Sequence, residues 1–97
     1  MRVIAIGTLR AFWQKHADAE IPLRSWYADA SRADWATPAE VKAAYRNASF
    51  VANNRVVFNI KGNSYRLVVA AHYNRRMMFV RFVGTHTEYD KIDATTI

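Results

Sequence analysis

The side chains best suited to moving protons lie near the end of the sequence. His86, Glu88, Tyr89 and Lys91 fall within six residues, directly after a glycine–threonine pair. Imidazole, carboxylate and phenol groups are those that proteins use as general acids and bases, and histidine is the side chain whose ordinary pKa lies nearest neutrality. The segment is therefore a candidate acid–base site, with His86 as its leading member.

Each of these residues also has a structural alternative. His86 could hydrogen-bond Asp90 or a backbone carbonyl and fix the end of the chain, and Glu88 and Asp90 could pair with a neighbouring arginine. Tyr89 could donate a proton or stack on a base. An extended segment would turn Glu88 to the same side as His86, whereas a helical turn would separate them. The residues alone do not separate proton donor from proton acceptor.

The chain is basic, and its charge is uneven. Fourteen Lys and Arg stand against eight Asp and Glu, a formal charge of +6, and from Asn53 onward there are seven basic and three acidic residues. A positive field of this kind raises the local concentration of polyanions, so nucleic acid is the first partner to consider. Small basic proteins without a nucleic-acid partner are common, however, so charge alone does not decide.

The second half of the sequence predicts an antiparallel meander. Hydrophobic alternation indicates strands over residues 55–60, 64–73 and 77–83, separated by Lys-Gly-Asn and Asn-Arg-Arg turns. Turns at residues 62–63 and 74–75 set the register, because a two-residue loop fixes hairpin pairing. The expected pairs include Lys61 with Ser64, Asn59 with Arg66, Val57 with Val68, His72 with Met77, Val68 with Arg81 and Leu67 with Phe82.

This register divides the sheet into an apolar face and a face that carries charge. The charged face holds Asn59, Lys61, Arg66, His72 and Arg81, with the apolar residues Val57, Val68, Met77 and Phe79 between them. Cations on one face repel each other unless an anion lies among them, and exposed apolar groups beside cations suit bases and phosphates. The alternative is an ordinary solvated sheet face. For His72, near the far turn, partial burial competes with substrate contact.

The first half predicts helices that cover the apolar face. After a short strand over residues 2–6, Thr8 can cap a first helix, Pro22 can begin a second, and Thr37-Pro38-Ala39-Glu40 has the pattern of a capping box for a third. The tryptophans fall at helical spacing, which favours a place in the core. His16 lies on the apolar stripe of the first helix and is expected to pack there.

Other classes of protein are disfavoured by composition. There are no cysteines, and three scattered histidines do not form a metal-ligand pattern, so we expect neither a metal site nor a cofactor. No stretch approaches the ~20 apolar residues of a membrane helix, and the first residues do not resemble a signal peptide. We expect one cytoplasmic domain over residues 1–97, with no membrane partner.

Two stretches resemble the HigB family of toxins, within the RelE-like superfamily. They are Arg-Val-Val-Phe-Asn-Ile-Lys-Gly-Asn-Ser-Tyr-Arg-Leu-Val-Val over residues 55–69 and Arg-Phe-Val-Gly-Thr-His-Thr-Glu-Tyr-Asp-Lys-Ile over residues 81–92. The resemblance extends over nearly the whole chain. It implies an α+β fold of the RelE type, with N-terminal helices packed on one face of a small antiparallel sheet, and the toxin component of a type II toxin–antitoxin system.

The resemblance also implies a reaction. RelE-like toxins are metal-independent messenger RNA endoribonucleases, commonly acting at the ribosome, in which a ribose 2′-hydroxyl attacks the adjacent phosphorus. On this basis His86, Tyr89, Arg81, Arg66 and Glu88 are the candidate catalytic residues, and Lys61, Asn59, His72 and Lys91 the candidate RNA-binding residues. Arginine stays charged and can bind phosphate bidentately, so Arg66 and Arg81 suit the phosphorane anion.

The implied partners are messenger RNA, the ribosome and a HigA-type antitoxin, with operator DNA bound only through the antitoxin complex. A non-catalytic RNA- or ribosome-binding module with the same basic face is the main alternative. A DNA-binding regulator is a third, but no helix-turn-helix pattern supports it. If the helical half binds the antitoxin, Trp26, Trp35 or Tyr45 are the residues we expect in its footprint.

Overall fold

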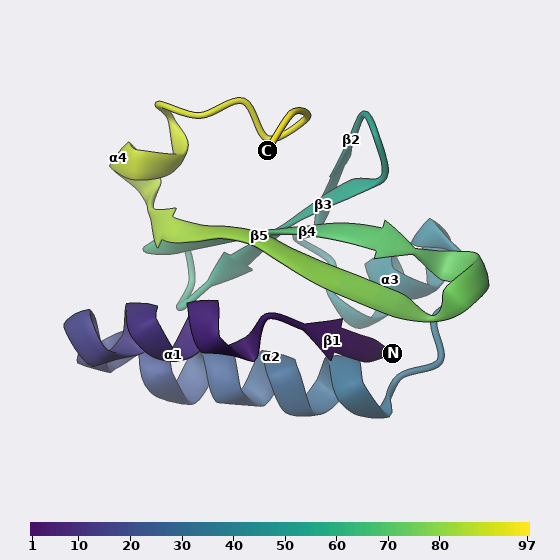
Figure 1. Ribbon diagram of the computed structural model, residues 1–97, viewed down its shortest axis with the longest axis horizontal. Coiled ribbons are helices and arrows are strands. Elements are labelled where there is room, and N and C mark those ends of the chain that lie inside the picture. The colour runs from purple at the N-terminus through teal and green to yellow at the C-terminus, as the bar shows by residue number, and fades with distance from the viewer.

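The computed structural model describes the whole chain, residues 1–97, and has its N-terminal helices on one side of a five-stranded sheet (Figure 1). In chain order the elements are β1 Arg2–Ile4, α1 Ile6–Lys15, a 3₁₀ turn Ala17–Ala19, α2 Glu20–Arg32, α3 Pro38–Ala44, β2 Ser49–Val51, β3 Arg55–Ile60, β4 Tyr65–His72, a 3₁₀ turn Tyr73–Arg75, β5 Met77–Thr85 and α4 His86–Tyr89. The expected α+β class is confirmed.

The sheet has the order β1-β5-β4-β3-β2. The strands β2 to β5 are antiparallel to their neighbours, whereas β1 runs parallel to β5. In Figure 1, α1 and α2 lie beneath one face, and α4 and the C-terminal segment lie on the opposite side, which we call the outer face. The sheet therefore separates the helical layer from the last residues of the chain.

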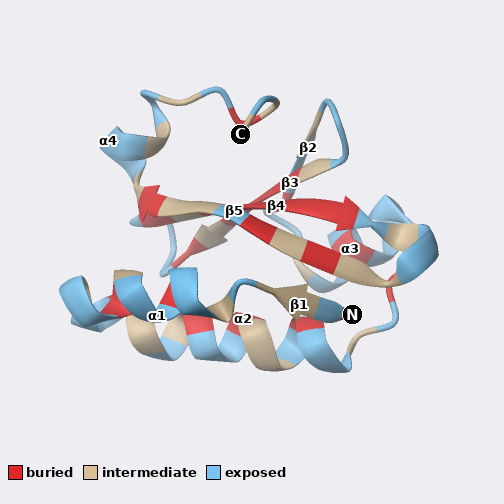
Figure 2. Ribbon diagram, viewed as in Figure 1, coloured by how far each residue is buried: buried red, intermediate tan, exposed pale blue.

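The core lies between the helices and the inner face of the sheet. Leu23 and Trp26 of α2 are almost completely buried, as are Phe58, Leu67 and Met78 of the strands, and the buried segments face one another across the two layers (Figure 2). The Trp26 and Phe58 rings meet edge to face, 5.4 Å apart. Each large side chain buried in this way contributes roughly 1.5–3 kcal/mol. The expectation that the tryptophans belong to the core is confirmed.

The first two helices begin earlier than the sequence suggests. β1 ends at Ile4, and α1 starts at Ile6 after Ala5, whose φ of 75° lies in the left-handed region, so Thr8 is inside the helix rather than its cap. α2 begins at Glu20, and Pro22 occupies its first turn, where a missing N–H removes no helical hydrogen bond. The 3₁₀ turn before α2 continues the chain directly into it.

The third helix is confirmed, with a modified cap. Thr37 Oγ1 accepts a hydrogen bond from the Glu40 N–H at 3.3 Å, and Pro38 occupies the first helical position. The Glu40 carboxylate accepts the N–H of Ala36 at 2.7 Å, one residue before the expected partner. The sequence pattern thus located this helix start correctly.

The central hairpin follows the expected register. Asn59 pairs with Arg66 and Val57 with Val68, as the turn position required. Pairing ends at Ile60 and Tyr65, however, because Lys61 has a φ of 52° and belongs to the turn, not to the strand. β2, a three-residue edge strand that pairs with β3, was not predicted. Of the two conformations that the sequence left open for the segment after β5, extended or helical, the structure has the helical one, α4.

A β-bulge in β5 changes the second register. His72 pairs with Met77 and Val69 with Val80 as expected, but Val68 pairs with Phe82, so Arg81 is the extra residue on its strand. The expected pairs of Val68 with Arg81 and of Leu67 with Phe82 are therefore wrong. A bulge places two residues opposite one and bends the strand. As a result Phe82 moves to the outer face, where it packs beside Val68.

Candidate functional site

Arg66 of β4 is the centre of a small cluster on the outer face. Its guanidinium carbon lies 5.9 Å from the ring centroid of Tyr89 in α4, and the Tyr89 ring lies 6.4 Å from that of Phe82 in β5. Arg66 is half-buried, and its Nη1 donates a hydrogen bond to the backbone carbonyl of Asn63 at 3.2 Å. Three elements thus bring one cation and two aromatic rings together. We call Arg66, Phe82 and Tyr89 the arginine–aromatic cluster.

Arg81 lies on the same face, at the bulge. Its guanidinium carbon is 6.0 Å from the Phe79 ring centroid, its side chain is exposed, and it forms no ion pair. Arg66 pairs with Gly84, three residues beyond Arg81, so the two backbone positions are separated by about 10 Å along the strand direction. The outer face therefore presents two guanidinium groups that have aromatic neighbours and no carboxylate partner.

His86 begins α4 and contacts an acid. Its Nδ1 lies 3.2 Å from Asp90 Oδ2, one helical turn later, and both side chains are about half exposed. This is the structural alternative that the sequence left open, but it is compatible with catalysis. A carboxylate at Nδ1 orients an imidazole, while Nε2 remains for other contacts.

Glu88 caps the helix and does not join the cluster. Its carboxylate accepts the Thr85 N–H at 2.8 Å, and Thr85 Oγ1 accepts the Glu88 N–H, which completes a capping box. The hydrogen bond from the Thr85 backbone lowers the pKa of Glu88. Its side chain lines a hollow against α1 that includes Phe12 and His16. The helical turn therefore separates Glu88 from His86.

Lys61 is directed away from the two arginines. Its Nζ lies 2.5 Å from Oδ2 of Asp18, in the turn between α1 and α2, and the Tyr65 hydroxyl donates to the same carboxylate. The expectation that the three cations share one side is wrong, because the left-handed backbone at Lys61 interrupts the strand alternation. The contact with Lys61 lowers the pKa of Asp18, as expected for a carboxylate beside an ammonium group.

The remaining candidates lie around this face. Asn59 is half-exposed and pairs with Arg66 across the strands, so it borders the arginine–aromatic cluster. His72 is exposed at the far end of β4, where its ring meets Phe79 edge to face at 5.1 Å. Lys91 is exposed directly after α4. His16, expected to pack on the apolar stripe of the first helix, is half-buried and stacks on Phe12 with ring centroids 4.3 Å apart.

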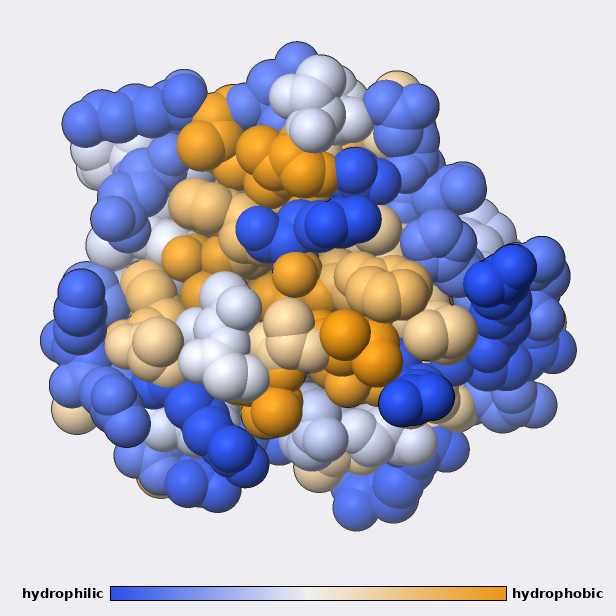
Figure 3. Space-filling view, viewed as in Figure 1, coloured by the Kyte–Doolittle hydropathy of each residue, from blue (hydrophilic) through white to orange (hydrophobic).

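The last residues of the chain cover part of the outer face. Ala94 is buried against Val57 and Val68, and Arg55 donates to the Ile97 carbonyl oxygen through Nε at 3.0 Å and Nη2 at 2.5 Å. Val57 and Val68, expected to be exposed beside the cations, are therefore buried. The more open part of the face is on β5, where Arg81 is exposed and Phe79 and Phe82 are half-buried. From the side on which β5 lies in front, apolar surface surrounds hydrophilic groups in the middle of the view (Figure 3).

Sequence reasoning missed this segment because residues 93–97 have no periodic pattern. A local signal was nevertheless present: Asp93 is followed by one alanine and then two threonines, and its carboxylate accepts both the N–H and the hydroxyl of Thr95, which lowers the pKa of Asp93. Aspartate bonded to the backbone two residues on is a turn former. The turn directs the chain back over the sheet.

Two further kinds of site are absent from the molecule. No helix is both long enough and apolar enough to cross a bilayer. No three histidine, aspartate or glutamate side chains come together in a group that could hold a metal ion.

Comparison with known proteins gives the family. A family model described as HigB toxin, RelE-like toxic component of a toxin–antitoxin system, matches residues 19–92, a range that contains Arg66, Arg81 and His86. The protein named mRNA interferase HigB from Escherichia coli O6:H1, strain CFT073, is 27% identical over 94 residues, which cover 95% of this chain and 91% of that protein. The resemblance seen in the sequence is confirmed. The chain belongs to the HigB family of RelE-like toxins, the toxic components of toxin–antitoxin systems.

Proposed function

We propose that this toxin is a messenger RNA endoribonuclease that works without a metal ion. In the proposed reaction a ribose 2′-hydroxyl loses its proton and attacks the adjacent phosphorus, the bond to the 5′-oxygen breaks, and that oxygen takes up a proton. The products are a 2′,3′-cyclic phosphate and a free 5′-hydroxyl. The observation that carries the proposal is the pair of guanidinium groups, Arg66 and Arg81, which lie among aromatic rings on the outer face without a carboxylate partner.

The arginines suit the phosphate. The pentavalent intermediate carries more negative charge than the phosphodiester, and fixed cations near the reacting phosphorus stabilise it more than the substrate. Arg66 is half-buried and held by the Asn63 carbonyl, which limits its motion and orients its remaining N–H groups. Tyr89 and Phe82 can stack on the flanking bases, as aromatic residues do in single-stranded RNA recognition.

His86 is the preferred proton donor to the leaving oxygen. The Asp90 carboxylate beside Nδ1 orients the ring, which leaves Nε2 available to donate to the leaving oxygen. Tyr89, next to Arg66, is the second candidate for proton transfer. Glu88 is a poor candidate for the base. Its lowered pKa makes the carboxylate a weaker base, and the carboxylate already accepts the Thr85 N–H in the helix cap. Asn59, His72, Lys91 and Lys61 are proposed to contact the RNA backbone, Lys61 only after it leaves Asp18.

Cellular control follows from the same proposal. The activity is expected to act on messages at the ribosome, to be held in check by a HigA-type antitoxin, and to involve operator DNA only through the toxin–antitoxin complex. The E. coli relative is named an mRNA interferase, which supports the RNA substrate proposed here.

The direct test is to map the ends of a message incubated with the purified toxin, with and without ribosomes and with a chelator present. We expect cyclic phosphate ends, unchanged yield in the chelator, and no cleavage where a 2′-deoxynucleotide replaces the nucleotide that supplies the attacking hydroxyl. His86→Ala and Arg81→Ala should each lower the cleavage rate by roughly 100-fold, in the range of lost acid–base or oxyanion contacts. Growth arrest with intact RNA would instead indicate a non-catalytic module that binds RNA or ribosomes.

A further inference from the structure

A hollow between α1 and α4 lies beside the proposed cleavage site. Figure 1 shows α4 on one side of the end of β5 and α1 on the other, and β1 pairs with β5 only from Met77 to Phe79. The hollow has a volume of about 560 Å³, including its open mouth, and the residues that line it come from α1 and the residue after it, from β5 beyond Phe79 and from α4. Because Glu88 and Tyr89 are neighbours in α4, a nucleotide at the arginine–aromatic cluster is close to this hollow.

The floor of this α1–α4 hollow is largely apolar. The Phe12 and His16 rings stack with their centroids 4.3 Å apart, and each meets the Tyr65 ring edge to face, which holds both rings in place. Val83 of β5 is half-buried and also lines the hollow, and Ala11 has the smallest side chain of the lining residues and leaves the space open. Rings and an aliphatic group of this kind suit the face of a planar ligand.

The rim carries an acceptor and a donor of opposite charge. Glu88 Oε1 accepts the Thr85 N–H, and Oε2 accepts no hydrogen bond within the chain. The pKa of Glu88 is lowered, chiefly by the hydrogen bond from the Thr85 backbone and to a smaller extent by the charges of His16 and Lys91, so the carboxylate is ionised at neutral pH. Lys15 of α1 is exposed and forms no ion pair. The rim thus offers one free carboxylate oxygen and one free ammonium group.

This combination selects among kinds of ligand. A phosphate would be repelled by the Glu88 carboxylate. A metal ion would meet a single carboxylate, without the group of ligands that it needs. A neutral planar group with an N–H donor beside an acceptor matches both rim and floor, and the nucleobases with an exocyclic amino group, adenine, cytosine and guanine, have this form. Uracil presents a carbonyl oxygen where cytosine has its amino group, and a carboxylate repels that oxygen.

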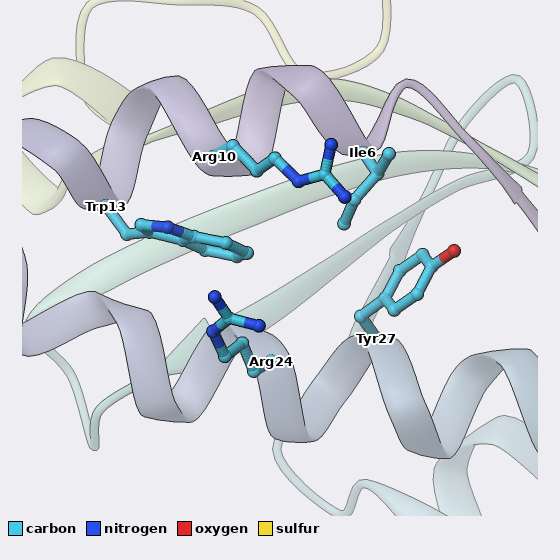
Figure 4. Close-up of a pocket in the computed structure, with 5 residues that line it drawn as sticks. All are labelled: Ile6, Arg10, Trp13, Arg24 and Tyr27. Carbon is cyan, nitrogen blue, oxygen red and sulfur yellow. The ribbon is translucent and has the colours of Figure 1, made fainter.

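The hollow between α1 and α2 has a different character. Figure 4 shows Arg10 and Arg24 reaching into it, with the Trp13 and Tyr27 rings on either side of Arg24. None of its lining residues belongs to β5 or α4. The Arg24 guanidinium lies over the Trp13 ring, which is only 8% exposed and has no free face for a base. Arg10, an exposed cation of α1 outside the α1–α4 hollow, can therefore serve as a control for Lys15.

The aromatic residues expected in an antitoxin footprint do not offer another site. Trp26 and Trp35 are 1% and 8% exposed, so the expectation is wrong for both tryptophans. Tyr45 is half-buried, and its hydroxyl donates to Asp29 at 2.7 Å. Neither tryptophan presents its ring to a base or to a protein.

We propose that the α1–α4 hollow holds the base of a nucleotide next to the reacting phosphate, and that it selects bases with an exocyclic amino group over uracil. The amino group donates to Glu88 Oε2, and Lys15 donates to the neighbouring ring nitrogen or carbonyl oxygen of the base. Glu88 is then a specificity-determining residue as well as a helix cap. The inference rests on the proposed function for its RNA substrate and adds to it the base that the toxin reads.

The test compares cytosine with uracil, which have the same size and differ in the donors and acceptors of one edge. Fluorescence anisotropy measures the affinity of the full-length toxin for two short single strands, one of 2′-deoxycytidine and one of 2′-deoxyuridine, neither of which has the attacking hydroxyl. The wild type should bind the cytosine strand about tenfold more tightly, as expected for one hydrogen bond to a charged group. Because the readout is a ratio of two affinities of one protein, partial unfolding of a variant does not change it.

Glu88→Gln reverses the polarity of the rim. The Thr85 N–H retains the glutamine oxygen, so the amide N–H groups turn to the hollow, and the ratio should then favour uracil. Ala11→Leu fills the hollow and should bring the ratio close to one. The matched controls lie in α3, where Glu40→Gln changes another capping glutamate and Ala43→Leu another exposed alanine, and both should keep the wild-type ratio.

Lys15→Gln and Arg10→Gln are a second matched pair, since each removes one exposed charge of α1. Lys15→Gln should weaken binding of the cytosine strand about threefold more than Arg10→Gln does. Equal losses would remove Lys15 from the site.

A wild type that does not distinguish the two strands, or a wild-type ratio in Glu88→Gln and Ala11→Leu, would overturn the proposal. So would weaker antitoxin binding by these two variants with an unchanged ratio, which would assign the hollow to a protein side chain. Cleavage of a message pool, randomised around one cleavage site, distinguishes this inference from the proposed function. A base preference in binding without any cleavage would remove the nuclease and retain the subsite, whereas cleavage with no preference against uracil at any position would do the opposite.

Discussion

Arg66 and Arg81 carry the same group in different settings, and this decides how each can act. Arg66 is half-buried, hydrogen-bonded to Asn63 and placed against Tyr89, so it loses little freedom when it binds a phosphate. Arg81 is exposed and contacts only the Phe79 ring. A flexible cation suits capture of the RNA backbone, and an oriented one suits the reacting phosphate. We therefore propose Arg66, rather than Arg81, as the residue most closely tied to the proposed cleavage step.

Replacing Arg66 tests this assignment. We expect Arg66→Ala to lower the cleavage rate by roughly 100-fold or more, and Arg66→Lys to recover only part of it, because lysine keeps the charge but not the bidentate geometry. The measurement is the single-turnover rate on a short message. Arg32→Ala, an exposed arginine at the end of α2, serves as the control. Rates within twofold of wild type for both Arg66 variants would place the essential cation elsewhere.

Glu88 offers a test that separates capping from catalysis. A glutamine can still accept the Thr85 N–H, so Glu88→Gln should retain cleavage within a few-fold, whereas Glu88→Ala should lower both the rate and the melting temperature by loosening the turn that carries His86 and Tyr89. A general base would behave differently, because glutamine cannot accept a proton. Abolished cleavage in Glu88→Gln with an unchanged melting temperature would restore Glu88 to the catalytic set.

At the scale of elements, the sequence predicted those features that depend on the alternation of apolar and polar residues and on the residues of turns and caps. The β3–β4 register followed from the Gly62-Asn63 turn, and the Thr37 cap located α3. The bulge at Arg81 could not be predicted from the sequence, because the residue types at positions 81 and 82 are compatible with both a regular and a bulged strand. The side of the sheet on which Lys61 lies was predicted wrongly for a related reason. Its left-handed backbone belongs to the folded turn, and a lysine at this position does not indicate such a conformation.

The contact of Asp18 with Lys61 and Tyr65 ties the β3–β4 hairpin to the turn between α1 and α2. Asp18→Asn should lower the melting temperature at neutral pH, since asparagine keeps at most one weaker hydrogen bond. The folded pKa of Asp18 is lowered, so its stabilisation is present above the unfolded value of 3.8 and is lost as the pH falls through the folded pKa. The difference in melting temperature between Asp18→Asn and wild type should therefore shrink only below pH 3.8.

Thermal melts of wild type and Asp18→Asn from neutral pH to strongly acidic pH measure this effect. Ser64→Ala is the control, because Ser64 is exposed in the turn of the β3–β4 hairpin. Tyr65→Phe removes the hydroxyl alone and should give a smaller loss. A constant difference between Asp18→Asn and wild type over the whole pH range would show that the ionised carboxylate does not contribute.

At the scale of the whole molecule, the two basic regions lie on different layers. Arg66 and Arg81 belong to the outer face of the sheet, and Arg10 and Arg24 belong to the helices. The net charge of +6 is thus divided between the outer face of the sheet and the helical layer.

The C-terminal segment completes the outer layer, and its removal is the last prediction. A chain ending at Asp93 loses Ala94, which packs on Val57 and Val68, and the Ile97 carbonyl, which accepts two hydrogen bonds from Arg55. Exposure of the two valines should cost about 1–3 kcal/mol, which lowers the melting temperature of a domain of this size by roughly 5–20 °C. Ala94→Asp in the full chain should act in the same direction by burying a carboxylate, whereas Thr96→Ala, at an exposed position, should leave the melt nearly unchanged. Equal melting temperatures of the shortened chain and the full chain would mean that the segment does not hold to the sheet in solution.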